Sequence, residues 1–259
     1  MNNSPKQARV FKIMYETIIL FITVGFIAQI IDGALGMAYG ISSTTILLST
    51  GIPPATASAS VHTAEIFTSG ISGLSHLKLG NVDKKLFTKL TIPGIIGGGI
   101  GAYTLTTIPA KTIKPLIALY LLIMGITIIQ KALKKSKRRN VKTKLFPLGL
   151  FGGFLDAIGG GGWGPIVTST LVAKGNDPRL AIGSVNLAEF FVTITEVATF
   201  TTTIGLTHWQ IIIGLIAGGT LAAPLAAYTC KKLPTRTLMI IVGTLITSLS
   251  IRTIYMTLL

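Results

Sequence analysis

The chain is poor in charge, poorer still in acids, and contains one cysteine. Of its 259 residues, 12% are charged and 49% are hydrophobic, and the mean hydropathy is +0.69. A typical soluble domain has about 25% charged residues. A soluble domain of this size could not bury so much apolar surface, so that class is excluded. The single Cys230 excludes an internal disulfide and a cysteine metal cluster.

Basic residues are missing from long parts of the chain. Lys and Arg number 23 against 8 acids, yet none occurs at 13–77, 90–110, 145–173 or 180–230. The short basic runs between these stretches are typical of cytoplasmic loops of a membrane protein. A nucleic-acid-binding protein gathers its basic residues on one folded face instead. We therefore predict a multi-pass protein of the cell membrane, with lipid around it and no nucleic-acid partner.

Apolar segments follow one another along the whole chain, and several approach the length of about 20 residues that a membrane-spanning helix needs. After a polar N-terminal segment, 1–14, the first apolar run lacks a clear cleavage site, so we interpret it as a membrane helix and not as a signal peptide. The segments lie at 15–31, 37–50, 57–77, 87–108, 115–133, 145–158, 165–173, 180–206, 210–230 and 236–257.

Two of the junctions are rich in glycine. Residues 33–40 read Gly-Ala-Leu-Gly-Met-Ala-Tyr-Gly, and residues 159–165 read Gly-Gly-Gly-Gly-Trp-Gly-Pro. Four successive glycines do not hold a regular helix, because ordering them costs too much backbone entropy. Pro165 suits the first position of a new helix, since it has no amide hydrogen. Each junction therefore predicts two half-helices that meet at an unwound break.

The two breaks belong to an internal repeat. An offset of 124 aligns Asp32 with Asp156 and Glu65 with Glu189, and it gives twelve identities in the 34 positions from Asp32 to Glu65. The sequence thus predicts an all-α polytopic membrane protein made of two homologous helical repeats. The first repeat spans 15–133 and the second spans 145–259, with the basic linker 134–144 between them.

The basic residues also predict an orientation. If each broken pair is a hairpin, the repeats are inverted, and 17 basic residues share the side of the linker against 6 on the other side. If each pair is one crossing, the repeats are parallel and the division is 16 against 7. Both counts place the basic run 131–144 in the cytoplasm. We favour the hairpin, because a single helix of 36 residues would be about 54 Å long.

Interrupted hydrophobic segments at corresponding positions of two halves indicate the binding site of a secondary transporter. The alternative is a packing kink, with glycines that allow close helix contact. A small anion could bind the half-helix N-termini, where free amides and the helix dipole attract negative charge, with help from nearby hydroxyl, amide, imidazole and aromatic groups. The candidate substrate-binding residues are Gly36, Tyr39, Gly40, Ser42, Ser43, Thr44, Ser60, His62, Gly160, Trp163, Gly164, Thr168, Ser184 and Asn186.

Five of the eight acids are predicted to lie at membrane depth: Asp32 directly follows the first apolar segment, and Glu65, Asp156, Glu189 and Glu196 lie within later ones. Ionisable groups at membrane depth are costly and usually functional. They could carry protons as the coupling ion, or they could accept hydrogen bonds from the unwound backbone. We favour the structural role for Asp32 and Asp156, which sit at the breaks, and leave both roles open for Glu65 and Glu189.

The chain resembles the TauE/SafE sulfite exporter family of anion permeases. The resemblance rests on the two breaks, 33–40 and 159–165, together with the motifs at 51–60 and 181–186, once in each half. It implies a transporter of sulfite or of another small sulfur oxyanion or organosulfonate.

Three other functions stay in view. A proton-coupled carrier of organic carboxylates and a passive anion channel could use the same scaffold. An intramembrane enzyme is disfavoured, because the three histidines do not form metal-ligand spacing with the acids, and His62 with Glu65 lacks a partner motif. We expect no cofactor and no metal. The sequence does not specify an oligomeric state.

Overall fold

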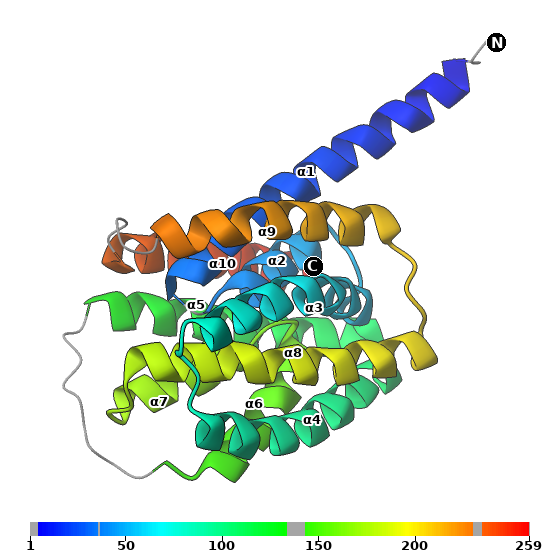
Figure 1. Cartoon of the computed structure of the whole chain (residues 1–259). Helices are drawn as coiled ribbons and strands as arrows, with labels where there is room; N and C mark the ends of the chain where they lie inside the picture. The colour runs from blue at the N-terminus through cyan, green and yellow to red at the C-terminus, as the bar shows by residue number, and fades with distance from the viewer. Residues whose placement is uncertain (1–4, 36, 134–142, 230–234, 259) are drawn as a thin grey trace.

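The structure, a computed structural model, describes residues 5–35, 37–133, 143–229 and 235–258 (Figure 1). Every regular element in these ranges is a helix. The elements are α1 (Pro5–Leu35), α2 (Tyr39–Ser49), α3 (Pro54–Lys78), α4 (Lys84–Thr107), α5 (Ala110–Leu133), α6 (Leu145–Gly159), the π-helix η1 (Gly164–Thr168), α7 (Ser169–Ala173), α8 (Pro178–Thr203), α9 (Trp209–Thr229) and α10 (Thr235–Leu258).

The helices follow the predicted apolar segments closely, with two differences. Helix α1 begins at Pro5, so most of the polar segment 1–14 is helical, and its N-terminal end projects from the bundle in Figure 1. The predicted segment 165–173 is divided into η1 and α7. A π-turn inside a helix is uncommon and occurs frequently at functional sites.

Short connections are set by residues that favour helix starts. The Asp83 carboxylate caps α4 by accepting hydrogen bonds from the amides of Lys85 (2.8 Å) and Leu86 (3.2 Å). Asp177 caps α8 in the same way, and Pro178 follows it at the first helical position. Because these side chains satisfy the free amides of the first turn, each helix starts immediately after its turn.

The largest helix contacts cross between the two halves of the chain. Helix α1 packs on α9, α4 on α6, α3 on α8, and α5 on α10. His62 of α3 lies at the level of Glu196 of α8, and Ser72 of α3 at the level of Asn186. The residue number thus rises along α3 as it falls along α8, so these two helices are antiparallel. Gly125 on α5 faces Thr247 on α10, and Gly243 on α10 faces Ile129 on α5, so this pair is antiparallel too.

The starts and ends of several helices gather at one end of the bundle. In Figure 1, the end of α3, the start of α4, the start of α8 and the end of α9 all lie on the left. Ser184 near the start of α8 hydrogen-bonds both the amide and the carbonyl of Asp83, which precedes α4. The basic residues at 78–89, 174 and 179 therefore belong to the same end of the molecule.

The outer surface of the bundle is apolar. Within the part of the chain that the structure describes, three helical stretches are long and apolar enough to cross a membrane, at Ala110–Leu133, Pro178–Thr203 and Met239–Thr257. Large side chains are more than half exposed on the outward faces of several helices, where lipid would cover them. Examples are Ile27, Ile92, Ile100, Ile123, Leu221 and Ile251.

Glycines let α4 and α6 approach closely. A Cβ atom on Gly97 would lie 2.0 Å from the Leu150 carbonyl oxygen, so the two backbones would have to separate. We expect Gly97→Ala to destabilise the protein by about 1–3 kcal/mol, the usual cost of overpacking. Gly99→Ala is the matched control on the same helix, because its Cβ would meet only Thr195 at 3.5 Å. Thermal unfolding in detergent measures both, and equal melting temperatures would contradict the prediction.

Candidate functional site

The two helix breaks touch each other in the interior. A Cβ atom on Gly40, at the start of α2, would lie 2.6 Å from Gly161 Cα, in the break after α6. Gly160 and Gly161 both have positive φ, 64° and 136°, which side-chain-bearing residues rarely adopt. Thr44 on α2 donates a hydrogen bond to the Gly160 carbonyl oxygen. The glycines thus provide both the backbone conformation and the close approach of the breaks.

A carboxylate lies at each break and accepts hydrogen bonds from its backbone. Asp156 Oδ1 accepts from the amides of Gly162 (2.6 Å) and Trp163 (2.9 Å), and Asp32 Oδ1 accepts from the Tyr39 amide (3.3 Å). The amides at the N-termini of the two half-helices are therefore partly occupied by anions of the chain itself. In this conformation a substrate anion has fewer of these donors than the sequence suggested.

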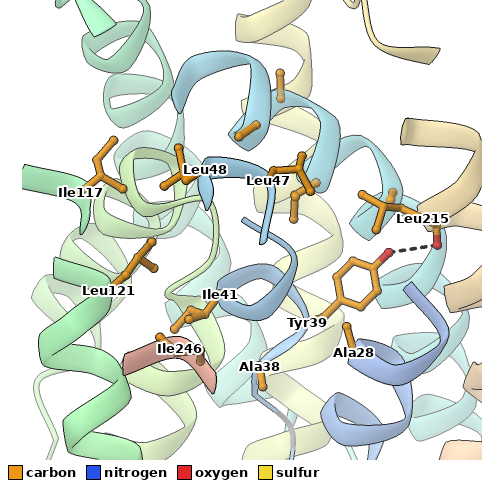
Figure 2. Close-up of a cluster of buried hydrophobic side chains, with 14 of the residues drawn as sticks. Ala28, Ala38, Tyr39, Ile41, Leu47, Leu48, Ile117, Leu121, Leu215 and Ile246 are labelled. Carbon is orange, nitrogen blue, oxygen red and sulfur yellow. Dashed lines mark hydrogen bonds between the residues drawn. The ribbon is translucent and has the colours of Figure 1, made fainter. Parts of the chain in front are cut away.

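The aromatic residues at the breaks anchor them to neighbouring helices. The Tyr39 hydroxyl donates to the Leu215 carbonyl of α9 at 3.1 Å, as Figure 2 shows. The Trp163 indole nitrogen donates to the Val185 carbonyl of α8, also at 3.1 Å. Both side chains are buried. Their polar atoms are satisfied by backbone groups, so they fix the positions of the breaks.

Helix α2 lies deep in the apolar core. Figure 2 shows Ile41, Leu47 and Leu48 of α2 together with Ile117 and Leu121 of α5. A half-helix surrounded by apolar side chains presents only its N-terminal end to the polar centre. The sequence can place such a short helix inside the protein because its polar residues are small hydroxyls.

A small cavity opens between the two breaks. Three acidic residues line it, Asp32, Glu65 and Glu189, and the other lining residues lie at or next to the breaks. The lining residues are Asp32, Met37, Ala38, Tyr39, Gly40, Ile41, Glu65, Gly161, Gly162, Gly164, Pro165 and Glu189. Three like charges around one cavity repel an anion unless they are neutralised.

A buried ionic cluster lies beside this cavity. His62 Nδ1 is 2.7 Å from Glu65 Oε2 and 3.3 Å from Glu196 Oε2, and its Nε2 is 3.2 Å from the Asp156 carbonyl oxygen. The Phe200 ring stacks on the imidazole, with ring centroids 6.4 Å apart. His62, Glu65 and Glu196 come from α3 and α8, so the cluster links these two helices.

Ligand atoms of His62, Asp156 and Glu196 all lie within 4.8 Å of one another, which is close enough for a shared metal ion. The sequence gave no sign of this grouping, because the three residues lie on three different helices. The 2.7 Å contact from His62 to Glu65 is a direct hydrogen bond that engages one ring nitrogen. We therefore interpret the cluster as hydrogen-bonded and ionic.

A family model described as sulfite exporter TauE/SafE matches residues 21–253. The chain belongs to the TauE/SafE family. It is 42% identical over 249 residues to the "Probable membrane transporter protein YtnM" of Bacillus subtilis (strain 168). The alignment covers 92% of this chain and 83% of that relative. No solved structure matches the chain. The family and the relative's name show a membrane transporter, which has a small substrate and a membrane environment.

The candidate substrate-binding hydroxyl groups of this TauE/SafE protein divide into those without and those with a hydrogen-bond partner in the part of the chain that the structure describes. Ser42, Ser43 and Thr168 are buried and their hydroxyl oxygens have no hydrogen-bond partner among the described residues. Ser60 bonds back to the Thr56 carbonyl on its own helix, and Thr44 bonds Gly160. Only the first set keeps its donors free for a ligand.

Two candidate residues of this TauE/SafE protein lie away from the breaks. Ser184 bonds Asp83 near the basic end of the bundle, and Asn186 donates to Ser72 Oγ at 2.9 Å. Gly164 begins η1 and lines the cavity. Gly36 lies outside the described residues.

The sequence analysis missed Tyr120 of α5. Its hydroxyl is buried, has no hydrogen-bond partner among the residues that the structure describes, and would lie 2.4 Å from a Cβ atom on Gly162. Tyr120 has no aromatic counterpart at the repeat offset, so no sequence signal marked it. Ser72 was missed as well, although the repeat offset of 124 aligns it with Glu196 in the sequence.

Proposed function

We propose that the chain is a secondary carrier of a small anion, sulfite or another sulfur oxyanion or organosulfonate. The observation that carries this proposal is the meeting of two broken helices at one interior cavity, in a TauE/SafE transporter. Broken helices at membrane depth are the usual location of substrate in secondary transporters. Proton-coupled transport of an organic carboxylate and passive anion flow remain the alternatives.

We further propose that the chain consists of two inverted repeats. Equivalent contacts recur at the repeat offset. Gly25 of α1 lies against the Leu215 carbonyl of α9, and Gly149 of α6 lies against the Leu90 carbonyl of α4. Gly149 follows Gly25 by 124 residues, and Leu215 follows Leu90 by 125 residues. Because α3 and α8 are equivalent in the repeat and run antiparallel, this relation supports inverted and not parallel halves.

Inverted halves also favour the hairpin count of basic residues, in which 17 lie on one side. With the positive-inside rule, that side is cytoplasmic and includes the run 131–144. The cavity then lies between the half-helix hairpins that enter from opposite sides. A carrier of this kind exposes a central site alternately as one half moves against the other.

We propose that substrate binds at the breaks, through the amides of α2 and η1 and the free hydroxyls of Ser42, Ser43 and Thr168. An anion and the three cavity carboxylates can share this small space only if protons neutralise the acids. This charge count supports proton coupling, with Glu65 and Glu189 as candidate proton carriers. Asp32 and Asp156 hold the breaks in shape.

Uptake into proteoliposomes tests the function. We expect saturable uptake of labelled sulfite, thiosulfate or methanesulfonate, with unlabelled carboxylates such as acetate and malonate as competitors. Ser43→Ala is expected to raise KM, by roughly tenfold for the loss of a hydrogen bond to a charged ligand. Ser60→Ala serves as the matched control, because its hydroxyl bonds its own helix. No saturable flux of any sulfur anion would rule the proposal out, and stronger inhibition by carboxylates would favour the second substrate class.

A further inference from the structure

The His62 imidazole faces oxygen acceptors on both sides. Its Nδ1 is opposite the carboxylates of Glu65 and Glu196, and its Nε2 is opposite a backbone carbonyl oxygen. Each contact needs a hydrogen on the ring nitrogen, since none of these oxygens can donate when the carboxylates are ionised. With both carboxylates ionised, the geometry corresponds to an imidazolium, with two hydrogens and one positive charge, in the interior of the protein.

The charges in this cluster do not balance. One imidazolium faces two carboxylates, and the three side chains are almost completely buried. Neither oxygen of Glu196 makes a hydrogen bond among the described residues, so its only close polar contact is the His62 ring nitrogen at 3.3 Å. A buried charge without a full set of partners is costly. The cluster has the composition of a site that gains a further proton.

Glu65 connects this cluster to the cavity between the breaks. Its Oε2 bonds His62 at 2.7 Å, while its Oε1 lies 2.8 Å from the position of a Cβ atom on Gly40. Glu65 also lines the cavity. A negative charge entering the cavity would therefore act directly on the carboxylate that holds His62.

The equivalent place in the other repeat is neutral. The offset of 124 converts the pair His62 and Glu196 into Asn186 and Ser72. Asn186 Nδ2 donates to Ser72 Oγ at 2.9 Å across the same α3–α8 interface. Because α3 and α8 are antiparallel, the charged pair lies toward the start of α3 and the neutral pair toward its basic end. Only one half of the interface carries titratable groups at this position.

We propose that His62, Glu65 and Glu196 form a proton-binding site that balances the charge of the transported anion. When the anion enters the cavity, the proton on His62 Nδ1 is transferred to Glu65 Oε2 across the hydrogen bond, in which the two heavy atoms lie 2.7 Å apart. This leaves a neutral carboxyl at the cavity and a neutral imidazole that still donates from Nε2. Glu196 then loses its cationic partner and takes up one proton from the side where α3 begins, so one proton accompanies one negative charge. This inference rests on the proposed function.

Other titratable groups face the site from the helices packed around it, and the charge balance includes them. They are Asp32 on α1, Tyr39 on α2, Tyr120 on α5, Asp156 on α6 and Glu189 on α8. Asp156 keeps its bonds to the Gly162 and Trp163 amides, and Tyr39 keeps its bond to Leu215. The proposal leaves the protonation of these other groups unchanged and assigns the exchangeable proton to His62 and Glu196, whose 3.3 Å contact bridges α3 and α8.

The test measures protons and anions together in proteoliposomes. Methanesulfonate is a suitable probe, because it carries one negative charge and stays ionised near neutral pH, so any proton taken up is carried by the protein. A pH-sensitive dye and labelled anion give the number of protons per anion. We expect about one proton per negative charge for the wild type, as electroneutral coupling requires. Glu196→Gln should reduce this ratio toward zero.

A second variant reproduces the pair of the other repeat. His62→Asn combined with Glu196→Ser introduces the neutral contact that the protein already uses between Asn186 and Ser72, and it should also lose the proton. Ser72→Ala is the control, and its ratio should equal that of the wild type. Anion flux without proton uptake in the wild type, or an unchanged ratio in either folded variant, would overturn the inference alone.

Two further outcomes separate the possibilities. Proton uptake abolished by EDTA would mean that the cluster holds a metal ion, which overturns the proton site. Absence of any anion flux in the wild type would overturn the proposed function and this inference with it.

Discussion

Asp156→Ala is expected to destabilise the protein strongly and to abolish transport. The substitution leaves the buried amides of Gly162 and Trp163 without their acceptor, whose bonds are 2.6 and 2.9 Å long. An unsatisfied buried amide costs about 1–3 kcal/mol, so the two together cost about 2–6 kcal/mol. Thermal unfolding in detergent measures the loss, and proteoliposome uptake measures the transport defect.

Two variants separate hydrogen bonding from charge at this position. Asp156→Asn keeps an oxygen acceptor for the two amides and should recover much of the lost stability. Asp32→Ala should cost less than Asp156→Ala, because Asp32 is only partly buried and accepts one long bond of 3.3 Å. A melting temperature of Asp156→Ala close to that of Asp32→Ala would show that the carboxylate does not hold the second break.

The sequence predicted the positions of the breaks because glycine and proline act locally. Four successive glycines disfavour a regular helix, and Pro165 lacks the amide hydrogen that would continue one. The repeat offset also predicted that Asp32 and Asp156 occupy equivalent places. In the structure, both carboxylates accept hydrogen bonds from backbone amides. Local backbone chemistry therefore accounts for most of what the sequence revealed about the site.

Contacts between segments that are distant in the chain could not be predicted from the sequence. Nothing in the spacing of His62 and Glu196 predicts a 3.3 Å contact, because it depends on α3 and α8 packing antiparallel. The same holds for Ser184, whose partner Asp83 lies 101 residues away. The candidate hydroxyls could be named from composition, but only packing decides which of them keep a free donor.

The contact of the two breaks gives the sharpest prediction, because it requires that residue 161 have a hydrogen atom in place of a side chain. Gly161 has φ 136°, and a Cβ atom there would lie 2.3 Å from Gly40 C and 2.3 Å from Ile41 N. Both are backbone atoms, which cannot rotate away as a side chain can. We expect Gly161→Ala to separate the breaks, to abolish anion uptake and to lower the melting temperature.

The control isolates the contact from backbone strain. Gly51 also has a positive φ, 95°, but a Cβ atom there would meet nothing within 4 Å. Gly51→Ala should therefore cost only the strain of that conformation, about 1–2 kcal/mol, and leave uptake measurable. If Gly161→Ala lost no more stability and transport than Gly51→Ala, the two half-helices would not depend on their contact. Gly40, Ile41 and Gly161 also line the cavity, so Gly161→Ala should reduce transport by more than its loss of stability explains. Uptake measured well below the melting temperature of each variant separates the transport defect from unfolding.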